Sequence, residues 1–368
     1  MIKQGVISRI SFLAAGLVIF LVGFFLLLNL VIPAFLVLVL AYLALKNHET
    51  KSYTFLHLAF LFLMNFSIGY FIMMHDLPIY YIPFAVIPML ACILFNDLEI
   101  ALLLSLTSSI SIVSVKSDHL ALSVFLFTSG LFASLLVYGA RRRITLIRAG
   151  FSIGAMQMLL FFFLNSFRIG HLEPFLWFAV NGVVSSIIVV GALRIFEYLF
   201  DTMTNFTLLE LADFNHPLLQ RMTLEAPGTY HHSLVVGNLA DAASRVVGAN
   251  ALLARIGAYY HDIGKLQKPH YFSENQSLSE SRHDSLSATM SKLVIMNHVK
   301  EGVELAQKYK LHKNIIDFIN QHHGTSLVYY FYRRALENLE GTGQQVEEEG
   351  FRYPNKCRIP WTTYRNVS

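Results

Sequence analysis

Charged residues are scarce in this sequence, and the shortage is confined to one part of it. Asp, Glu, Lys and Arg make up 14% of the 368 residues, whereas apolar residues make up 55%. Residues 1–199 hold 18 of these charged residues, and the shorter remainder from residue 200 holds 34. An ordinary soluble core cannot bury so many apolar side chains, which excludes a wholly soluble protein and indicates contact with lipid. The contrast predicts two domains with different surroundings.

Cysteine is also scarce, with Cys92 in an apolar run and Cys357 near the end as the two copies. Their spacing excludes a disulfide framework or a thiolate metal site and leaves the redox compartment open. The apolar run after Arg9 is too long for a signal-peptide core and lacks a small-residue cleavage site, so we expect a membrane anchor there. The net charge of +4 is modest and predicts no nucleic-acid partner.

Long apolar runs fill the first part of the chain, and several reach the ~20 residues that a helix needs to cross a bilayer. They fall at residues 10–30, 32–46, 53–74, 79–95, 97–114, 119–139, 147–167 and 174–199. Pro33 and the region 79–114 leave the count open, and we expect seven or eight spans. Arg141, Arg142 and Arg143 lie between two runs, where the positive-inside rule predicts a cytosolic loop. Two further crossings would return the chain to the cytosol.

The sequence pattern from residue 200 onward predicts helices and contains no alternation of apolar and polar residues that would indicate a β-strand. Residues 208–213 have the pattern of an amphipathic connector, which ends before Pro217. Helical periodicity then predicts helices at 231–247, 251–260 with Asn250 as the cap, 286–309, 314–321 and 326–339. The expected fold class is all-α. Its parts are a polytopic transmembrane bundle at 1–199, a connector at 200–228, a cytosolic helical domain at 229–354 and an atypical tail at 355–368.

Histidine is concentrated in the second part, where ten of the fifteen copies lie between residues 216 and 323. Imidazole nitrogen and carboxylate oxygen together suit iron, manganese or zinc. The candidate ligands come from four separate places: His232, His261, Asp262, His298, His322 and His323. Neighbouring side chains on a helix diverge by about 100°. We therefore expect the two adjacent pairs at helix ends. Structural or solvent-facing roles are expected for His231, His270 and His312.

A carboxylate between imidazoles can bridge two cations, and such a pair activates water and clamps a phosphoryl group. Asp262 is the candidate bridge. Lys265, three residues later, is the candidate for neutralising a phosphate oxygen as charge accumulates in the transition state. A lone histidine is more often a surface or capping residue, but the six candidates together favour a metal site. The pattern therefore predicts phosphodiester hydrolysis, with Asp262 and Lys265 as catalytic residues.

These residues resemble the HD-domain phosphohydrolases, in the motif of His232, His261-Asp262-Ile263-Gly264-Lys265, His298 and His322-His323-Gly324-Thr325. Residues 226–233, 257–262, 272–276 and 330–332 more narrowly resemble the bacterial seven-transmembrane HD proteins, the PgpH-type cyclic di-AMP phosphodiesterases. The resemblance implies hydrolysis of cyclic di-AMP to pApA by a multi-pass protein of the bacterial cell membrane with a cytosolic HD domain. It also implies two divalent metal ions, manganese or iron. One would be bound by His232 and His261, the other by His298, His322 and His323, with Asp262 between them.

The sequence departs from this family at both ends. The family has an extracellular domain between a first anchor and seven spans, and we expect that domain to be absent here. After residue 354 the family continues into a helix with a final aspartate ligand, whereas residues 355–368 contain no acidic residue. We expect weakened metal binding and reduced or no activity, which adding that helix would restore.

Three other functions stay open. A cyclic di-GMP phosphodiesterase of the same fold has Gly-Tyr-Pro after its paired histidines, where this chain has Gly324-Thr325-Ser326. A membrane receptor or regulator would bind a nucleotide without turnover, which the atypical tail favours. A nucleoside triphosphate hydrolase is disfavoured by the membrane part. The expected partners are a cyclic dinucleotide and the lipid bilayer, with a homo-oligomer as a further candidate.

Overall fold

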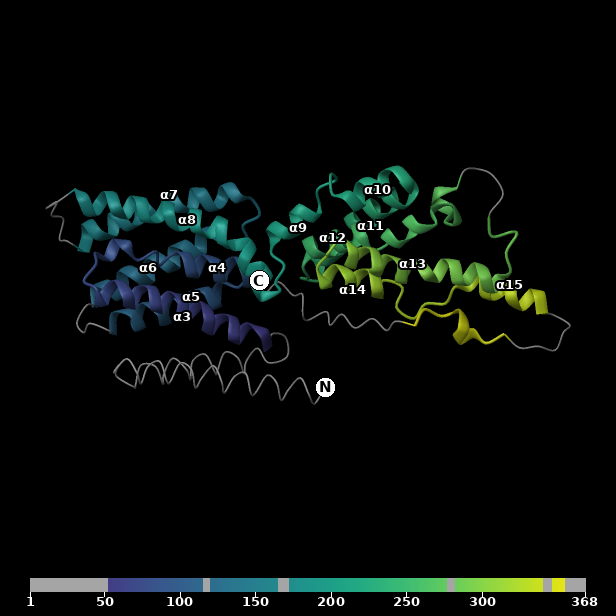
Figure 1. Cartoon of the computed structure of the whole chain (residues 1–368), viewed down its shortest axis with the longest axis horizontal. Helices are drawn as coiled ribbons and strands as arrows, with labels where there is room; N and C mark the ends of the chain where they lie inside the picture. The colour runs from purple at the N-terminus through teal and green to yellow at the C-terminus, as the bar shows by residue number, and fades with distance from the viewer. Residues whose placement is uncertain (1–51, 115–119, 165–171, 277–281, 340–345, 355–368) are drawn as a thin grey trace. The chain divides into compact units, whose positions relative to one another are not determined.

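The computed structural model describes residues 52–114, 120–164, 172–276, 282–339 and 346–354. The expected spans at 10–30 and 32–46 and the tail at 355–368 lie outside the described residues. Those that are described form helices and no β-strand, which confirms the all-α fold class. The chain divides into two compact units, Met1–Phe206 and Thr207–Ser368 (Figure 1). The finer boundaries at 199, 228 and 354 stay predictions.

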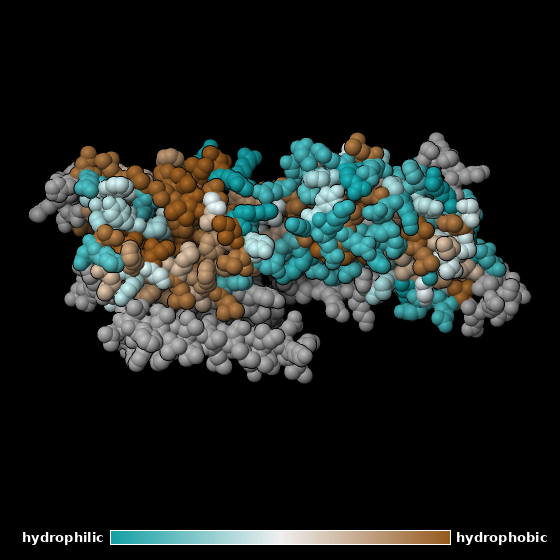
Figure 2. All heavy atoms as spheres, in the orientation of Figure 1, coloured by the Kyte–Doolittle hydropathy of each residue, from teal (hydrophilic) through white to brown (hydrophobic). Residues whose placement is uncertain are grey.

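The first unit is a bundle of apolar helices that lie side by side (Figure 1). Its elements are α3 (Ser52–Met74), the 3-10 turn η1 (Ile79–Tyr81), α4 (Val86–Phe95), α5 (Leu98–Val113), α6 (Leu120–Val137), α7 (Arg143–Leu164) and α8 (Glu173–Phe200). Among the described residues, three helical segments are long and apolar enough to cross a membrane: Leu56–Met74, Arg143–Leu164 and Glu173–Phe200. Figure 2 shows apolar side chains gathered over α7 and α8, as expected of a membrane protein.

The region 79–114 contains two separate α-helices, α4 and α5, and neither is among the segments long enough to cross a membrane, so the span count there stays a prediction. Asn96 has the left-handed conformation, with a φ of 48°, and ends α4. Asp97 then caps α5, since its side chain accepts a hydrogen bond from the Ile100 amide at 3.2 Å. The ten residues of α4 extend for about 15 Å. This is half of the ~30 Å hydrocarbon core, so α4 is too short to cross it alone.

Close backbone contact joins α7 to α8. A Cβ atom added to Gly182 would lie 2.3 Å from the Gly154 nitrogen, so only glycine fits at this crossing. Small residues allow membrane helices to approach in this way. Asn181 is buried beside the crossing, and its amide nitrogen donates to the carbonyl oxygens of Tyr80 at 2.8 Å and Ile82 at 3.0 Å. These bonds tie α8 to the segment that contains η1.

The second unit is helical as well, and the face of it that Figure 2 shows is largely hydrophilic. Its long elements are α9 (Asn205–Leu211), α10 (Pro217–Glu225), α11 (Pro227–Val246), α12 (Ala251–Tyr260), α13 (Ala288–Lys308), α14 (Lys313–Gln321) and α15 (Tyr329–Leu339). Three 3-10 turns lie between α12 and α13, namely η3 (Ile263–Gln267), η4 (Pro269–Tyr271) and η5 (Ser273–Asn275), and a further one, η6 (Glu348–Phe351), follows α15.

Of two predicted helix starts in the second unit, one agrees with the structure and one differs from it. The Asn250 side chain accepts a hydrogen bond from the Leu253 amide at 3.0 Å, which confirms the expected start of α12. Helix α11 begins at Pro227, four residues before its expected start at 231. Proline favours the first position of a helix, because its fixed φ suits the helix and its missing N–H has no partner there. The helix therefore begins within the stretch 200–228 that was expected to be a connector.

Candidate metal centre

The two adjacent pairs of candidate ligands lie at helix ends, as expected. Helix α12 ends at Tyr260, so His261 is its C-terminal cap and Asp262 precedes η3. Helix α14 ends at Gln321, and His322 is its cap. There the backbone leaves the helical path and can direct neighbouring side chains to one point. The remaining candidates, His298 and His232, lie within α13 and α11.

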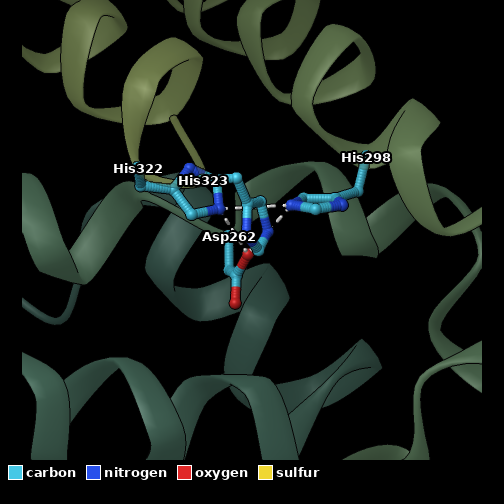
Figure 3. A group of neighbouring side chains, drawn as sticks. All are labelled: Asp262, His298, His322 and His323. Carbon is cyan, nitrogen blue, oxygen red and sulfur yellow. Dashed lines mark hydrogen bonds and ion pairs between the residues drawn. The ribbon is translucent and has the colours of Figure 1, made fainter. Parts of the chain in front are cut away.

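The other five candidate side chains gather around Asp262, whose side chain is only 3% exposed. Figure 3 shows His298, His322 and His323 reaching this carboxylate from two different helices. The Asp262 Oδ1 atom lies 3.3 Å from His298 Nε2 and 3.4 Å from His322 Nε2. The other oxygen, Oδ2, lies 3.1 Å from His261 Nε2 and 3.9 Å from His232 Nε2. Two groups of donors thus share one carboxylate.

Three of the imidazoles are oriented by carbonyl groups of their own helices. The Nδ1 atom lies within hydrogen-bond distance of the carbonyl oxygen three residues earlier in His261 (2.7 Å, Ala258), His298 (2.5 Å, Ile295) and His322 (2.9 Å, Ile319). A carbonyl oxygen only accepts, so each Nδ1 carries the proton. In a neutral ring, Nε2 then presents a lone pair, and all three lone pairs face Asp262.

Lone pairs that face a carboxylate repel it unless a cation lies between them. Asp262 Oδ1 is buried and accepts no hydrogen bond from the residues that the structure describes. Ligands about 2.1 Å from one metal ion lie about 3 Å apart when they are at right angles. The observed separations of 3.1–3.4 Å between Asp262 and three imidazoles are close to this value. The donor set therefore fits divalent metal ions.

The electrostatic surroundings keep most of the site in the protonation state that metal binding requires, with neutral imidazoles and an ionised carboxylate. Burial lowers the pKa of His232 and His322, and burial together with neighbouring imidazoles lowers the pKa of His323 to about 3. Burial alone would raise the pKa of Asp262, but the surrounding imidazoles hold it well below its usual value. At His261, burial lowers the pKa but the adjacent carboxylate outweighs this effect and raises it, so a metal ion competes with a proton for Nε2 of this ring.

Lys265, the candidate for neutralising a phosphate oxygen, also lies beside Asp262. Its Nζ atom is 2.8 Å from Asp262 Oδ2 and 2.7 Å from Glu274 Oε1. Burial lowers the pKa of Lys265, but the two carboxylates outweigh it and raise the pKa. The sequence indicated no role for Glu274, because no local pattern pairs it with Lys265, nine positions earlier. Another unpredicted residue, Tyr353, stacks on His323 with the rings 4.1 Å apart.

The three histidines expected to be structural or solvent-facing lie outside both groups of candidate ligands. His231 and His270 are exposed. The His312 Nδ1 atom accepts a hydrogen bond from the Asn314 amide at 3.2 Å and so caps α14. Their positions agree with the expectation.

Comparison with known proteins gives matches over both units. A family described as "7TM receptor with intracellular HD hydrolase" matches residues 18–204, and the HD domain family matches residues 229–350. The cyclic-di-AMP phosphodiesterase PgpH of Bacillus subtilis (strain 168) is 48% identical over 175 residues, which cover 48% of this chain and 24% of that protein. The protein of the same name from Listeria monocytogenes is 36% identical over 278 residues, which cover 74% and 38%.

A crystal structure of the L. monocytogenes PgpH HD domain in complex with cyclic-di-AMP is 45% identical, with a TM-score of 0.37. The match covers 39% of this chain and 65% of that one. The chain spans less than two fifths of the length of either full-length relative. The family match at residues 18–204 covers half of the chain, and an HD domain with a divalent-metal donor set follows it. This protein belongs to the family of 7TM receptors with an intracellular HD hydrolase.

Proposed function

We propose that this chain is a metal-dependent phosphodiesterase that hydrolyses cyclic di-AMP to pApA. The observation that carries the proposal is the arrangement of three imidazole lone pairs around the buried Asp262 carboxylate. Such a donor set suits two divalent ions with one bridging ligand. The substrate is inferred from relatives, since two proteins that are 36% and 48% identical are named cyclic-di-AMP phosphodiesterases.

The proposed division of ligands follows the two groups of donors. His232 and His261 would hold one ion, and His298, His322 and His323 would hold the other, with Asp262 shared. Manganese or iron suits these nitrogen and oxygen donors. When bound, the two ions supply an activated water molecule and neutralise charge on the phosphoryl oxygens. The hydrogen bonds from Nδ1 to the helix carbonyls keep the rings aimed before and during the reaction.

Lys265 would contact the phosphate that is attacked. Its ammonium group has three N–H donors, of which Asp262 and Glu274 engage two. The third is available to a phosphate oxygen, and the positive charge stabilises the negative charge that develops on phosphorus-bound oxygens in the transition state. Two carboxylate contacts hold the ammonium in place, so little reorganisation is required during the reaction.

We also propose that the protein crosses the bacterial cell membrane several times and that its HD domain is cytosolic. Arg141 and Arg142 lie between α6 and α7, and Arg143 is the first residue of α7. Cationic segments of this kind at the end of a span favour the cytosolic side.

The test is hydrolysis of cyclic di-AMP by the full chain, purified in detergent and supplied with manganese or iron. We expect that the product is pApA and that its formation requires metal. Cyclic di-GMP should be hydrolysed more slowly than cyclic di-AMP. The matched control is Asp262→Asn, which keeps the shape of the side chain and removes the charge that both ions would share. Its product formation should fall to the level seen with a chelator.

Other outcomes would point to other functions. Binding of cyclic di-AMP without formation of pApA, at several manganese and iron concentrations, would support a nucleotide-binding regulator in place of an enzyme. Preferred cleavage of cyclic di-GMP would support the alternative phosphodiesterase. An unaffected Asp262→Asn variant would show that any hydrolysis occurs elsewhere.

A further inference from the structure

The turn η5 is fastened to the first turn of α11. The Thr229 hydroxyl donates to Glu274 Oε1 at 3.1 Å and accepts from the Asn275 side-chain amide at 2.8 Å. The Thr229 backbone amide donates to Asn275 Oδ1 at 3.1 Å. A Cβ atom on Gly228 would lie 1.8 Å from the Glu274 carbonyl oxygen, so glycine is required for this approach. Because His232 lies one helical turn further on, η5 also fixes the start of a helix that contains a candidate ligand.

Glu274, in the same turn, holds Lys265. Its Oε1 atom lies 2.7 Å from Lys265 Nζ, and the ammonium lies 2.8 Å from Asp262 on its other side. The Lys265 and Glu274 side chains are only 13% and 28% exposed, so water screens this interaction poorly. Three charged groups therefore form a row that starts at the metal centre and ends at η5.

The row has a consequence for metal binding. An ammonium group beside Asp262 opposes a metal ion at the same carboxylate, because both are positively charged. A second carboxylate on the far side of the ammonium offsets that repulsion, because it supplies a compensating negative charge. Without the Glu274 carboxylate, the Lys265 ammonium would pair with Asp262 alone. It would then compete with a metal ion for the lone pairs of the Asp262 oxygens.

We infer that Glu274 is a positioning residue of the hydrolase: it holds the Lys265 ammonium beside Asp262 and offsets its charge, so that ammonium and metal can share one carboxylate. This inference rests on the proposed function. It also gives a role to the stretch 272–276, which the proposed mechanism leaves without one. Glu274 itself acts through Lys265 and needs no contact with substrate.

The expected effect of Glu274→Gln is weaker manganese binding and slower turnover. The glutamine keeps a hydrogen-bond acceptor and loses the charge. We expect the dissociation constant for manganese to rise about tenfold and kcat to fall about tenfold, the range of one charge-assisted hydrogen bond. KM should change little, because Lys265 remains present in the site.

A double-mutant cycle tests whether Glu274 acts through Lys265. The full chain in detergent is compared with Glu274→Gln, Lys265→Gln and the double variant, by calorimetric titration with manganese. In the Lys265→Gln background, removing the Glu274 charge should cost no further affinity. Glu337→Gln is the matched control, since this glutamate also pairs with a cation, Arg333, but both side chains are exposed on α15. Its manganese affinity should equal that of the unsubstituted chain.

Equal losses of affinity from Glu274→Gln in both backgrounds, or no loss in either, would overturn the inference. Circular dichroism checks the fold of each variant. If Glu274→Gln does not fold, Glu274→Asp replaces it, because the aspartate retains the charge at a longer distance. A loss with aspartate that persists when Lys265 is absent would equally overturn the inference.

The two proposals fail separately. A chain that binds manganese with the expected coupling but forms no pApA contradicts the proposed function and leaves the positioning role of Glu274 standing. A chain that hydrolyses cyclic di-AMP but shows independent effects of Glu274 and Lys265 contradicts the positioning role alone.

Discussion

Substitution of Gly264 tests whether the packing of η3 against α13 positions the candidate metal ligands, because Gly264 lies at the contact between these two elements. A Cβ atom at this position would lie 1.8 Å from the His298 carbonyl oxygen and 2.5 Å from the Gly302 nitrogen. Both neighbours are backbone atoms of one helix, so no side-chain rotation relieves the clash. Ordinary contact begins at 3.4 Å, and α13 would have to move by about 1.6 Å if it moved along the line of that contact.

That displacement is large compared with the site. His298 Nε2 lies 3.3 Å from Asp262 Oδ1, and a shift of the whole helix would remove the ring from its place beside the carboxylate. A misplacement of 1 Å can cost about 100-fold in rate. We expect Gly264→Ala to weaken manganese binding and slow hydrolysis by about that factor, and to lower the free energy of unfolding by about 1–3 kcal/mol through overpacking.

Manganese titration, product assay and thermal unfolding of the full chain in detergent measure these effects. Two other glycines serve as controls. A Cβ atom on Gly302 would be 2.8 Å from Ile319 Cγ2, the end of a side chain that can move, so Gly302→Ala should have an intermediate effect. Nothing lies within 4 Å of the same atom on Gly350, and Gly350→Ala should be neutral. Normal manganese affinity and stability in Gly264→Ala would refute the claim that the close contact between Gly264 and α13 keeps His298 in place.

Two further predictions concern the stability of the second unit. The His216 Nδ1 atom accepts from the Leu218 amide at 3.3 Å, and burial lowers the pKa of His216 in the fold despite the opposing charge of Asp213. The unfolded chain then binds more protons, so this contribution to stability is present above the unfolded pKa of 6.5 and is lost as pH falls through and below it. His216→Asn, which caps without titrating, should flatten the fall in melting temperature between about pH 7 and pH 5, and an unchanged slope would contradict this. Tyr260 is fully buried, and its hydroxyl donates to the Leu211 carbonyl at 2.7 Å. Tyr260→Phe should lower the free energy of unfolding by about 1–3 kcal/mol in a denaturant titration, and an unaltered midpoint would argue against this bond.

Much of the fold was predictable because its signals are local. Apolar runs of sufficient length, the cap at Asn250 and helical periodicity depend on nearby residues, and these expectations agree with the structure. Residues 79–114 were ambiguous because apolar residues lie on both sides of the break. The break is made by Asn96 and Asp97, and neither Gly nor Pro marks it.

The candidate ligands were predictable from residue type and from two adjacent pairs that needed helix ends. Their support was not predictable, because it depends on contacts between distant segments. Nothing in the sequence pairs Lys265 with Glu274, or places Tyr353 on His323. The requirement for glycine at 264 likewise comes from the closeness of α13, which a motif alone cannot indicate.

The bonds from imidazole to carbonyl within α12, α13 and α14 make ring orientation a property of single helical turns. No loop has to close and no distant segment has to arrive before these three rings are correctly aimed. Unwinding the last turn of α12 or α14 would break the hydrogen bond between the His261 or His322 ring and its carbonyl group. The ring would then lose the orientation that metal binding requires. Fraying of either helix end is therefore expected to weaken metal binding.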